Sequence, residues 1–235
     1  MIDTAFNILS IVFSYIASFY ALKAIRRTEG RDRLLLSLLM FGIITYAVGE
    51  TIFTILEFTG SVVFPSIADI FFFSGSLSLV VGLFYFWMTS PKAIEHLERK
   101  DIALFIFVIF ITSAILAYVF FSLALPEGLG NPIQAFLNIF YPVSSAFTFL
   151  QVFLLRNYFK ESPLYRFFEY FGDGIFFLYV GDMMFTYSDW SGVYGGLAIA
   201  YNVIFMLGYA LIAFAFFLES RKLAPVHWEG FREKE

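Results

Sequence analysis

The chain has 235 residues, of which 60% are apolar and 14% are charged, and its mean hydropathy is +0.80. These values exclude an ordinary soluble domain. The formal net charge of −4 is small and the basic residues fall in short clusters, so nothing indicates nucleic-acid binding. The chain contains no cysteine, which excludes disulfides, thiol nucleophiles and cysteine-ligated metals.

Seven apolar runs are each long enough to cross a hydrocarbon core of about 30 Å. The first run begins almost at Met1 without a basic segment before it, and it is longer than the apolar part of a signal peptide. We therefore expect it to be retained as a span. The sequence predicts an all-α fold, an integral membrane seven-helix bundle. The bundle forms one domain over 1–220, and a short tail follows over 221–235. We assert no internal repeat. The predicted spans are roughly 4–22, 34–58, 66–88, 103–124, 132–157, 163–188 and 193–219.

All fifteen Lys and Arg residues fall on one side of this arrangement. They lie in the loops after the first, third and fifth spans, at the edges of the spans that these loops join and in the tail, whereas the other three loops contain none. Cytoplasmic loops carry an excess of Lys and Arg. We therefore expect a multi-pass protein of the cell membrane, with the lipid bilayer around it, the N-terminus outside and the C-terminus in the cytoplasm.

Acidic residues dominate the outer half of the predicted bundle, where no Lys, Arg or His is present. In the second span, Glu50 and Glu57 share a helical face with Tyr46, and Asp182 and Asp189 have the same spacing in the sixth span. Acids in hydrocarbon usually face a bundle interior or a wet cavity and carry function. We expect a pocket here that binds a small ligand, a lipid headgroup, a cation or a proton. Its candidate residues are Glu50, Glu57, Asp69, Asn138, Tyr141, Asp182, Tyr201 and Asn202.

A structural interpretation competes for each acid. Asp69 completes a capping box with Ser66, Asp189 caps the last span and Glu57 is solvated. Glu50 and Asp182 are too deep for such roles, so they either serve function or hydrogen-bond across helices as protonated carboxyls. Any metal in the pocket would be a hard cation such as Ca²⁺ or Mg²⁺, with Glu50 and Asp182 as ligands, and the sequence indicates no organic cofactor.

Three further residues are candidates for a relay or hinge towards the cytoplasm. Pro142 interrupts the fifth span, and Glu169 and Asp173 lie near the cytoplasmic end of the sixth, with Gly172 and Gly174 on either side of Asp173. The alternative is an ion-pair network with Arg166 or a neighbouring basic loop.

Two function classes are excluded by residue placement. Both histidines, His96 and His227, fall on the cytoplasmic side, and no span holds a Ser/His or Ser/Lys pair, so we expect no enzyme. Covalently bound retinal needs a lysine within a span, and the seven spans contain none, so a rhodopsin is excluded.

The stretch 48–76, VGETIFTILEFTGSVVFPSIADIFFFSGS, carries Gly49-Glu50, Glu57 and Pro65-Ser66-Ile67-Ala68-Asp69. It resembles the seven-helix membrane module at the N-terminus of many bacterial diguanylate cyclases and related signalling proteins. Tyr141-Pro142, Gly181-Asp182 and the segment 192–196 resemble later parts of that module. Ser145 stands where the module often has an acid, and no cyclase or kinase follows the last span.

The resemblance implies a sensory membrane region that signals through a separate cytoplasmic partner on the basic loops. The sequence thus predicts a stand-alone sensor or receptor-like protein. A cation- or proton-coupled transporter or channel is the first alternative, although the inner half of several spans is nearly devoid of polar residues. A structural assembly factor is the second.

Overall fold

The computed structural model describes residues 2–61, 64–89, 99–121, 131–160, 162 and 164–221. These residues form seven α-helices and no strand, and each helix coincides with one of the predicted spans to within a few residues. The predicted tail beyond Arg221, which carries His227, and the segment with His96 lie outside the described residues. The helices are α1 (Ile2–Ile25), α2 (Gly30–Phe58), α3 (Ile67–Met88), α5 (Arg99–Val119), α7 (Pro132–Tyr158), α8 (Tyr165–Ser191) and α9 (Gly195–Ser220).

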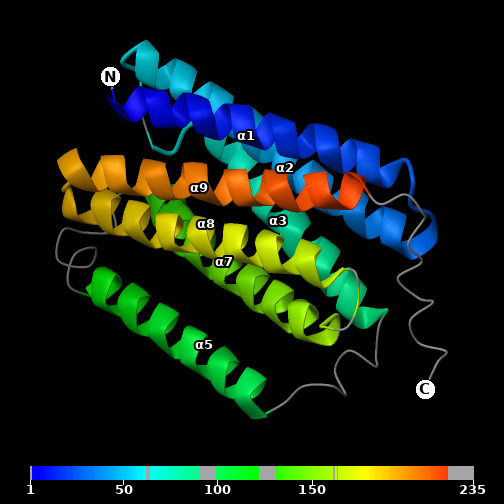
Figure 1. Cartoon of the computed structure of the whole chain (residues 1–235). Helices are drawn as coiled ribbons and strands as arrows, with labels where there is room; N and C mark the ends of the chain where they lie inside the picture. The colour runs from blue at the N-terminus through cyan, green and yellow to red at the C-terminus, as the bar shows by residue number, and fades with distance from the viewer. Residues whose placement is uncertain are drawn as a thin grey trace.

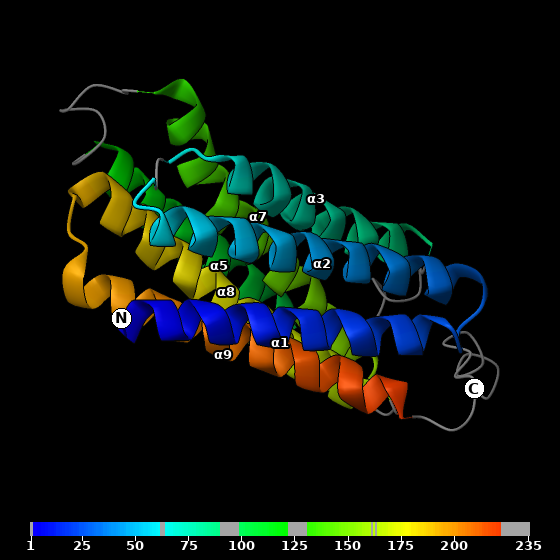
Figure 2. The ribbon, with the colours of Figure 1, turned by 90° about the horizontal axis from the view of Figure 1, so that it is seen from above.

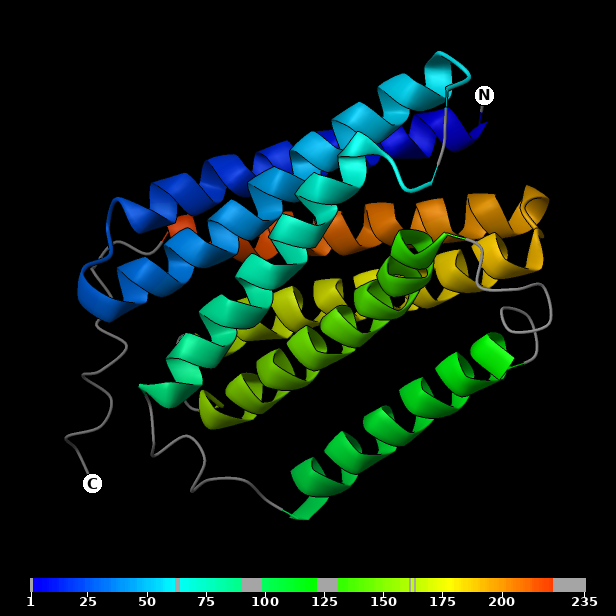
Figure 3. The ribbon, with the colours of Figure 1, turned by 180° about the vertical axis from the view of Figure 1, so that it is seen from behind.

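Six of these helices pack into one bundle, and α5 lies beside it against α7 (Figures 1 and 3). Within the bundle, α1 packs against α2 and α9, α3 packs against α2 and α7, and α8 packs against α7 and α9. The first residues of α1 and the last residues of α9 lie at opposite ends of the bundle (Figures 1 and 2).

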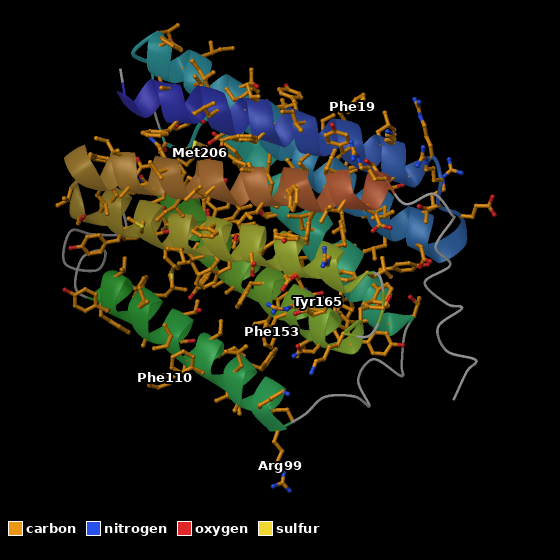
Figure 4. The ribbon with its side chains drawn as sticks, in the orientation of Figure 1. Phe19, Arg99, Phe110, Phe153, Tyr165 and Met206 are labelled. Atoms are coloured by element: carbon orange, nitrogen blue, oxygen red, sulfur yellow. The ribbon has the colours of Figure 1, made fainter. Side chains whose placement is uncertain are left out.

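Within the described residues, six helices are long and apolar enough to cross a membrane: α1, α2, α3, α5, α7 and α9. The exception is α8, which carries Glu169, Asp173, Asp182 and Asp189 and lies between α7 and α9. The outward-facing side chains suit a lipid environment. Phe19 on α1 is 64% exposed and Phe110 on α5 is 67% exposed, and both point away from the bundle (Figure 4).

Two helices begin with a side-chain cap, and the cap of α3 is the one that the sequence predicts. The Ser66 hydroxyl accepts from the Ala68 N–H, while an Asp69 carboxylate oxygen accepts from the Ser66 N–H at 2.6 Å, which forms the predicted capping box. The Asn131 side chain accepts from the Ile133 N–H at 3.0 Å at the start of α7. The start of α3, which carries Asp69, is therefore fixed by local hydrogen bonds.

The helix pair α2–α3 is repeated as α8–α9, whereas from the sequence alone we assert no internal repeat. Residues 42–60 align without a gap to residues 174–192. The identical positions are Gly42/Gly174, Ile43/Ile175, Val48/Val180, Gly49/Gly181, Phe53/Phe185, Thr54/Thr186 and Gly60/Gly192.

The glycines of this repeat make the same contacts in both copies. A Cβ on Gly42 would lie 3.1 Å from the Gly75 carbonyl oxygen, and a Cβ on Gly174 would lie 2.8 Å from the Gly208 carbonyl oxygen. A Cβ at either position would crowd the facing helix, so each glycine permits the close approach of two helices.

The bundle therefore consists of a first unit, α1–α3, and a second unit, α7–α9, joined through α5. The units meet reciprocally, because α1 of the first packs against α9 of the second and α7 of the second packs against α3 of the first.

Candidate ligand-binding site

A cavity of about 90 Å³ lies between the two units. One water needs roughly 10–15 Å³ measured in this way, so the cavity has room for a small molecule or several waters. Among the described residues its walls hold nine aromatic side chains, three carboxyl groups and no basic group. The lining residues are Asn7, Tyr46, Glu50, Phe53, Phe64, Ser66, Asp69, Phe72, Ser76, Tyr141, Leu178, Asp182, Phe185, Tyr201, Asn202, Phe205 and Tyr209.

The repeat accounts for most of this wall. Six pairs of lining residues occupy equivalent positions in the two units. Three pairs come from α2 and α8, 132 residues apart, and three come from α3 and α9, 133 residues apart, where Gly75 and Gly208 face the equivalent carbonyls of Gly42 and Gly174. The pairs are Tyr46/Leu178, Glu50/Asp182, Phe53/Phe185, Asp69/Asn202, Phe72/Phe205 and Ser76/Tyr209. Each unit thus supplies one carboxyl group at the same depth.

Glu50 and Asp182 are only partly satisfied by the protein. The Tyr209 hydroxyl donates to one oxygen of Glu50 at 3.0 Å, and the Ser145 hydroxyl donates to one oxygen of Asp182. The other oxygen of each carboxyl has no hydrogen-bond donor among the described residues, and neither group forms an ion pair there. Buried carboxylates without partners are costly, so two acceptor oxygens remain for an occupant of the cavity.

Asp69 lines the same cavity but is fully engaged. One oxygen belongs to the capping box with Ser66, and the other accepts from the Tyr141 hydroxyl at 2.9 Å. Its position matches the structural interpretation. Asp69 therefore places Tyr141 of the second unit against the start of α3 in the first.

Tyr201 and Asn202 reach the cavity from α9. The Tyr201 ring lies edge-on to Phe185 at 5.8 Å and to Phe205 at 6.1 Å between ring centroids. The Asn202 side chain is 9% exposed and makes no hydrogen bond with any described residue. Its amide thus faces the cavity with both polar atoms free.

Two predicted site residues do not line the cavity. Glu57 accepts from the Asn7 amide at 2.8 Å, two helical turns beyond Glu50. The Asn138 amide donates to Asp189 at 2.7 Å, beside the Gln134 amide at 2.9 Å. Asp189 is thus held by α7 side chains rather than capping α9, and Asn138 and Asp189 form a separate polar cluster between α7 and α8.

Sequence reasoning missed several lining residues. Tyr209 is the most important, since it donates to Glu50 and its ring lies 6.3 Å from that of Tyr46. The sequence alone also does not distinguish four lining phenylalanines from those that only fill the core or face lipid: Phe53, Phe72, Phe185 and Phe205. The repeat was the signal that could have found them, because it pairs Phe53 with Phe185 and Phe72 with Phe205.

The cavity wall is a poor match to a metal site. The part of the chain that the structure describes holds no group of three or more His, Cys, Asp or Glu residues placed to bind a metal ion. Ca²⁺ takes about six to eight oxygen ligands. Glu50 and Asp182 offer two free oxygens, and those of Asp69 are engaged.

The proposed relay residues lie away from the cavity. Glu169 pairs with Arg156 at 3.6 Å, not with Arg166, and shares the Tyr165 hydroxyl with it. Helix α7 continues through Pro142, and α8 continues through Asp173. The glycines beside Asp173 serve contacts: a Cβ on Gly172 would lie 3.0 Å from Val152. A hinge at these positions stays a prediction.

Phenylalanine packing closes the bundle at the end opposite the α2–α3 connection. Phe159 and Phe168 stack at 5.2 Å between centroids, and Phe167 and Phe216 lie edge-on at 5.3 Å. All four are at most 4% exposed. The polar cavity is thus separated from that end by an apolar core.

Comparison with known proteins found no matching family model, no similar curated protein and no similar solved structure.

Proposed function

We propose that this chain is a multi-pass protein of the cell membrane that binds a small ligand from the outer side and acts as a sensor or receptor. The observation that carries the proposal is the pair Glu50 and Asp182. Two carboxyl groups from different units face one cavity, and each keeps an oxygen without a hydrogen-bond donor among the residues that the structure describes. Groups with a purely structural role would have both oxygens engaged by the protein, as Asp69 does: one oxygen accepts from Ser66 at the start of its own helix and the other from Tyr141 of α7.

Charge supports an outer location for the cavity. Glu50 precedes the end of α2 at Phe58 by eight residues, about 12 Å of helix. The opposite ends of the helices carry Lys23, Arg33 and Arg156. Cytoplasmic ends are rich in such residues. In the proposed topology the chain crosses the membrane seven times, with the N-terminus outside and the C-terminus in the cytoplasm. Helix α8 is the least apolar span and is shielded from lipid by its neighbours α7 and α9.

The apolar core between the cavity and the cytoplasmic end of the bundle favours a receptor over an open transport pathway. A ligand that entered from outside would meet the stacked rings of Phe159 and Phe168 before the cytoplasm. Signalling would then need a change in helix packing, and a ligand drives such a change only through unequal affinity for two states. The resemblance of 48–76 to sensory modules supports the same role, with a cytoplasmic partner at the basic loops.

Cysteine labelling tests this function, because an introduced cysteine is the only thiol in the chain. Asn202→Cys places a thiol in the cavity wall. Ser78→Cys places one between α2 and α3, where the native hydroxyl donates to the Leu38 carbonyl at 2.8 Å, and serves as the matched control. We expect a membrane-impermeant methanethiosulfonate reagent to modify Asn202→Cys on intact cells and to spare Ser78→Cys. Modification from the cytoplasmic side alone, or none, would contradict an outward-open binding site.

The repeat favours a transporter as a second candidate. Transporters built from parallel repeats place their substrate sites at the interface between the repeats, and this cavity lies between two parallel units. Reconstituted vesicles separate the candidates. Uptake of a bound ligand that Glu50→Gln abolishes would establish a carrier, whereas binding in sealed, non-transporting vesicles would support the receptor.

A further inference from the structure

The cavity wall defines the chemistry of its ligand. We propose that it binds a small organic cation, whose ammonium group lies between Glu50 and Asp182 and whose alkyl part is enclosed by aromatic rings. This inference rests on the proposed function and adds the ligand class to it. Three independent features of the wall carry it: the free acceptors, the aromatic surface and the unpartnered amide of Asn202.

The acceptors call for a positively charged donor. Among the described residues, Glu50 and Asp182 each keep one oxygen without a hydrogen-bond donor, and no basic residue lines the cavity. An ammonium group supplies positive charge and up to three N–H donors, and charge-assisted hydrogen bonds of this kind are the stronger ones. An anion or a neutral apolar molecule would leave both carboxyl groups unpaired.

The aromatic surface separates an organic cation from a metal ion. Nine of the seventeen described lining residues are aromatic. Seven of these nine rings form two connected groups on the wall. Tyr46 lies 6.1 Å from Phe72, and Phe185 lies 5.4 Å from Phe64 and 5.8 Å from Tyr201 between centroids. Aromatic faces attract organic ammonium ions and also bury alkyl groups. A metal ion needs oxygen ligands that this surface lacks.

Asn202 completes the donor and acceptor pattern. Its side chain is nine-tenths buried, lines the cavity and makes no hydrogen bond within the described chain. A buried amide without partners costs free energy. Asn202 also stands where the first unit has Asp69, whose oxygens are engaged by Ser66 and Tyr141. The second unit therefore presents a free polar group at the position where the first unit uses its own for structure.

Calorimetric titration of the full-length, detergent-purified protein tests the ligand class. The probes are butylammonium chloride, tetramethylammonium chloride, calcium chloride and magnesium chloride, with 1-butanol as the neutral analogue and sodium chloride as the ionic-strength control. We expect butylammonium to bind and 1-butanol not to bind. Glu50→Gln and Asp182→Asn should each weaken butylammonium binding by about thirtyfold or more, as expected when one partner of a buried charge pair is removed.

Glu57→Gln is the matched control, because it removes a carboxyl group from the same helix outside the cavity, and the glutamine oxygen can still accept from Asn7 of the cavity wall. It should leave butylammonium binding unchanged. Asn202→Leu, similar in size, provides a further variant that leaves the carboxyl groups in place and should also weaken binding. Circular dichroism and size-exclusion profiles establish that each variant is folded before titration.

The outcomes separate this inference from the proposed function. Equal binding of butylammonium and 1-butanol, or an equal loss in Glu57→Gln, would overturn the organic cation as the ligand. Binding of Ca²⁺ or Mg²⁺ alone, lost in Glu50→Gln, would also overturn it while leaving a binding site at Glu50. Absence of external labelling at Asn202→Cys would overturn the proposed function itself.

Discussion

Glu50 of α2 and Asp182 of α8 occupy equivalent positions in two copies of one helical unit, and both line the same cavity. Each follows a glycine that lies against an aromatic ring. A Cβ on Gly49 would lie 2.8 Å from Phe72, and a Cβ on Gly181 would lie 2.5 Å from Phe205. The absent side chain lets the ring lie over the helix next to the carboxyl group. The acids and the aromatic wall are thus parts of one repeated arrangement.

Asp69→Ala and Glu50→Gln should differ in their effect on stability. Removing the Asp69 carboxyl eliminates the capping box and the acceptor for Tyr141, and we expect a loss of about 1–3 kcal/mol. Gln at position 50 can still accept from Tyr209, so the free energy of unfolding should change little. Thermal unfolding in detergent measures both. A large loss for both variants would support the structural assembly factor, in which all outer acids hold helices together.

Gly174→Ala should destabilise the contact between α8 and α9. The new Cβ would lie 2.6 Å from Ile212 and 2.8 Å from the Gly208 carbonyl oxygen, so the helices must move apart at a cost of about 1–3 kcal/mol. Gly196→Ala is the control, because its Cβ would meet nothing within 4 Å. Its melting temperature should be unchanged or slightly raised, since alanine favours helix. Equal melting temperatures for the two variants would contradict the close packing of the second unit.

Single cysteines at the two ends of α2 should report the orientation of the chain. Ser61 and Arg26 are both exposed and lie in the loops after and before α2. We expect an impermeant thiol reagent to label Ser61→Cys on intact cells and Arg26→Cys only after the membrane is permeabilised. The reverse pattern would show that the basic loops lie outside, against the distribution of Lys and Arg.

Arg156→Gln should have a small effect on stability. The Arg156 and Glu169 side chains are 31% and 30% exposed, and ion pairs open to solvent contribute about 0–1 kcal/mol. The exposed Arg166→Gln is the control. We expect chemical or thermal unfolding of both variants to stay within about 1 kcal/mol of the parent. A loss of several kcal/mol for Arg156→Gln alone would make this pair a structural anchor rather than a candidate relay.

The helices could be predicted because each apolar run is long and contains few charged residues. The ends of the helices are harder to predict from the sequence. In α2, for example, Asp32 and Arg33 belong to a helical turn that precedes the apolar run. The site was predicted in part. Glu50 and Asp182 stand out because charge is rare in such runs, whereas Glu57 shares their helical face but meets Asn7 of α1 instead. Helical periodicity predicts on which face of its own helix a side chain lies, but it does not predict which neighbouring helix that face contacts.

The repeat is difficult to recognise in the sequence because few of its identical residues have reactive or charged side chains. Gly42 and Gly174 are conserved between the units for a backbone contact that becomes visible only when α3 and α9 are placed beside them. The aromatic wall was missed for a related reason. With thirty-four phenylalanines in the chain, composition alone does not distinguish Phe72 or Phe205 from lipid-facing rings.

The most direct test of cation binding between the two units is protection from labelling. Phe53→Cys places a single thiol in the cavity wall on the same helix as Glu50. We expect butylammonium to slow its modification by an external impermeant reagent on intact cells, and to have no such effect when Glu50→Gln is added. An equal rate with and without butylammonium, or the same slowing in the Glu50→Gln background, would contradict a cation site formed by Glu50 and Asp182.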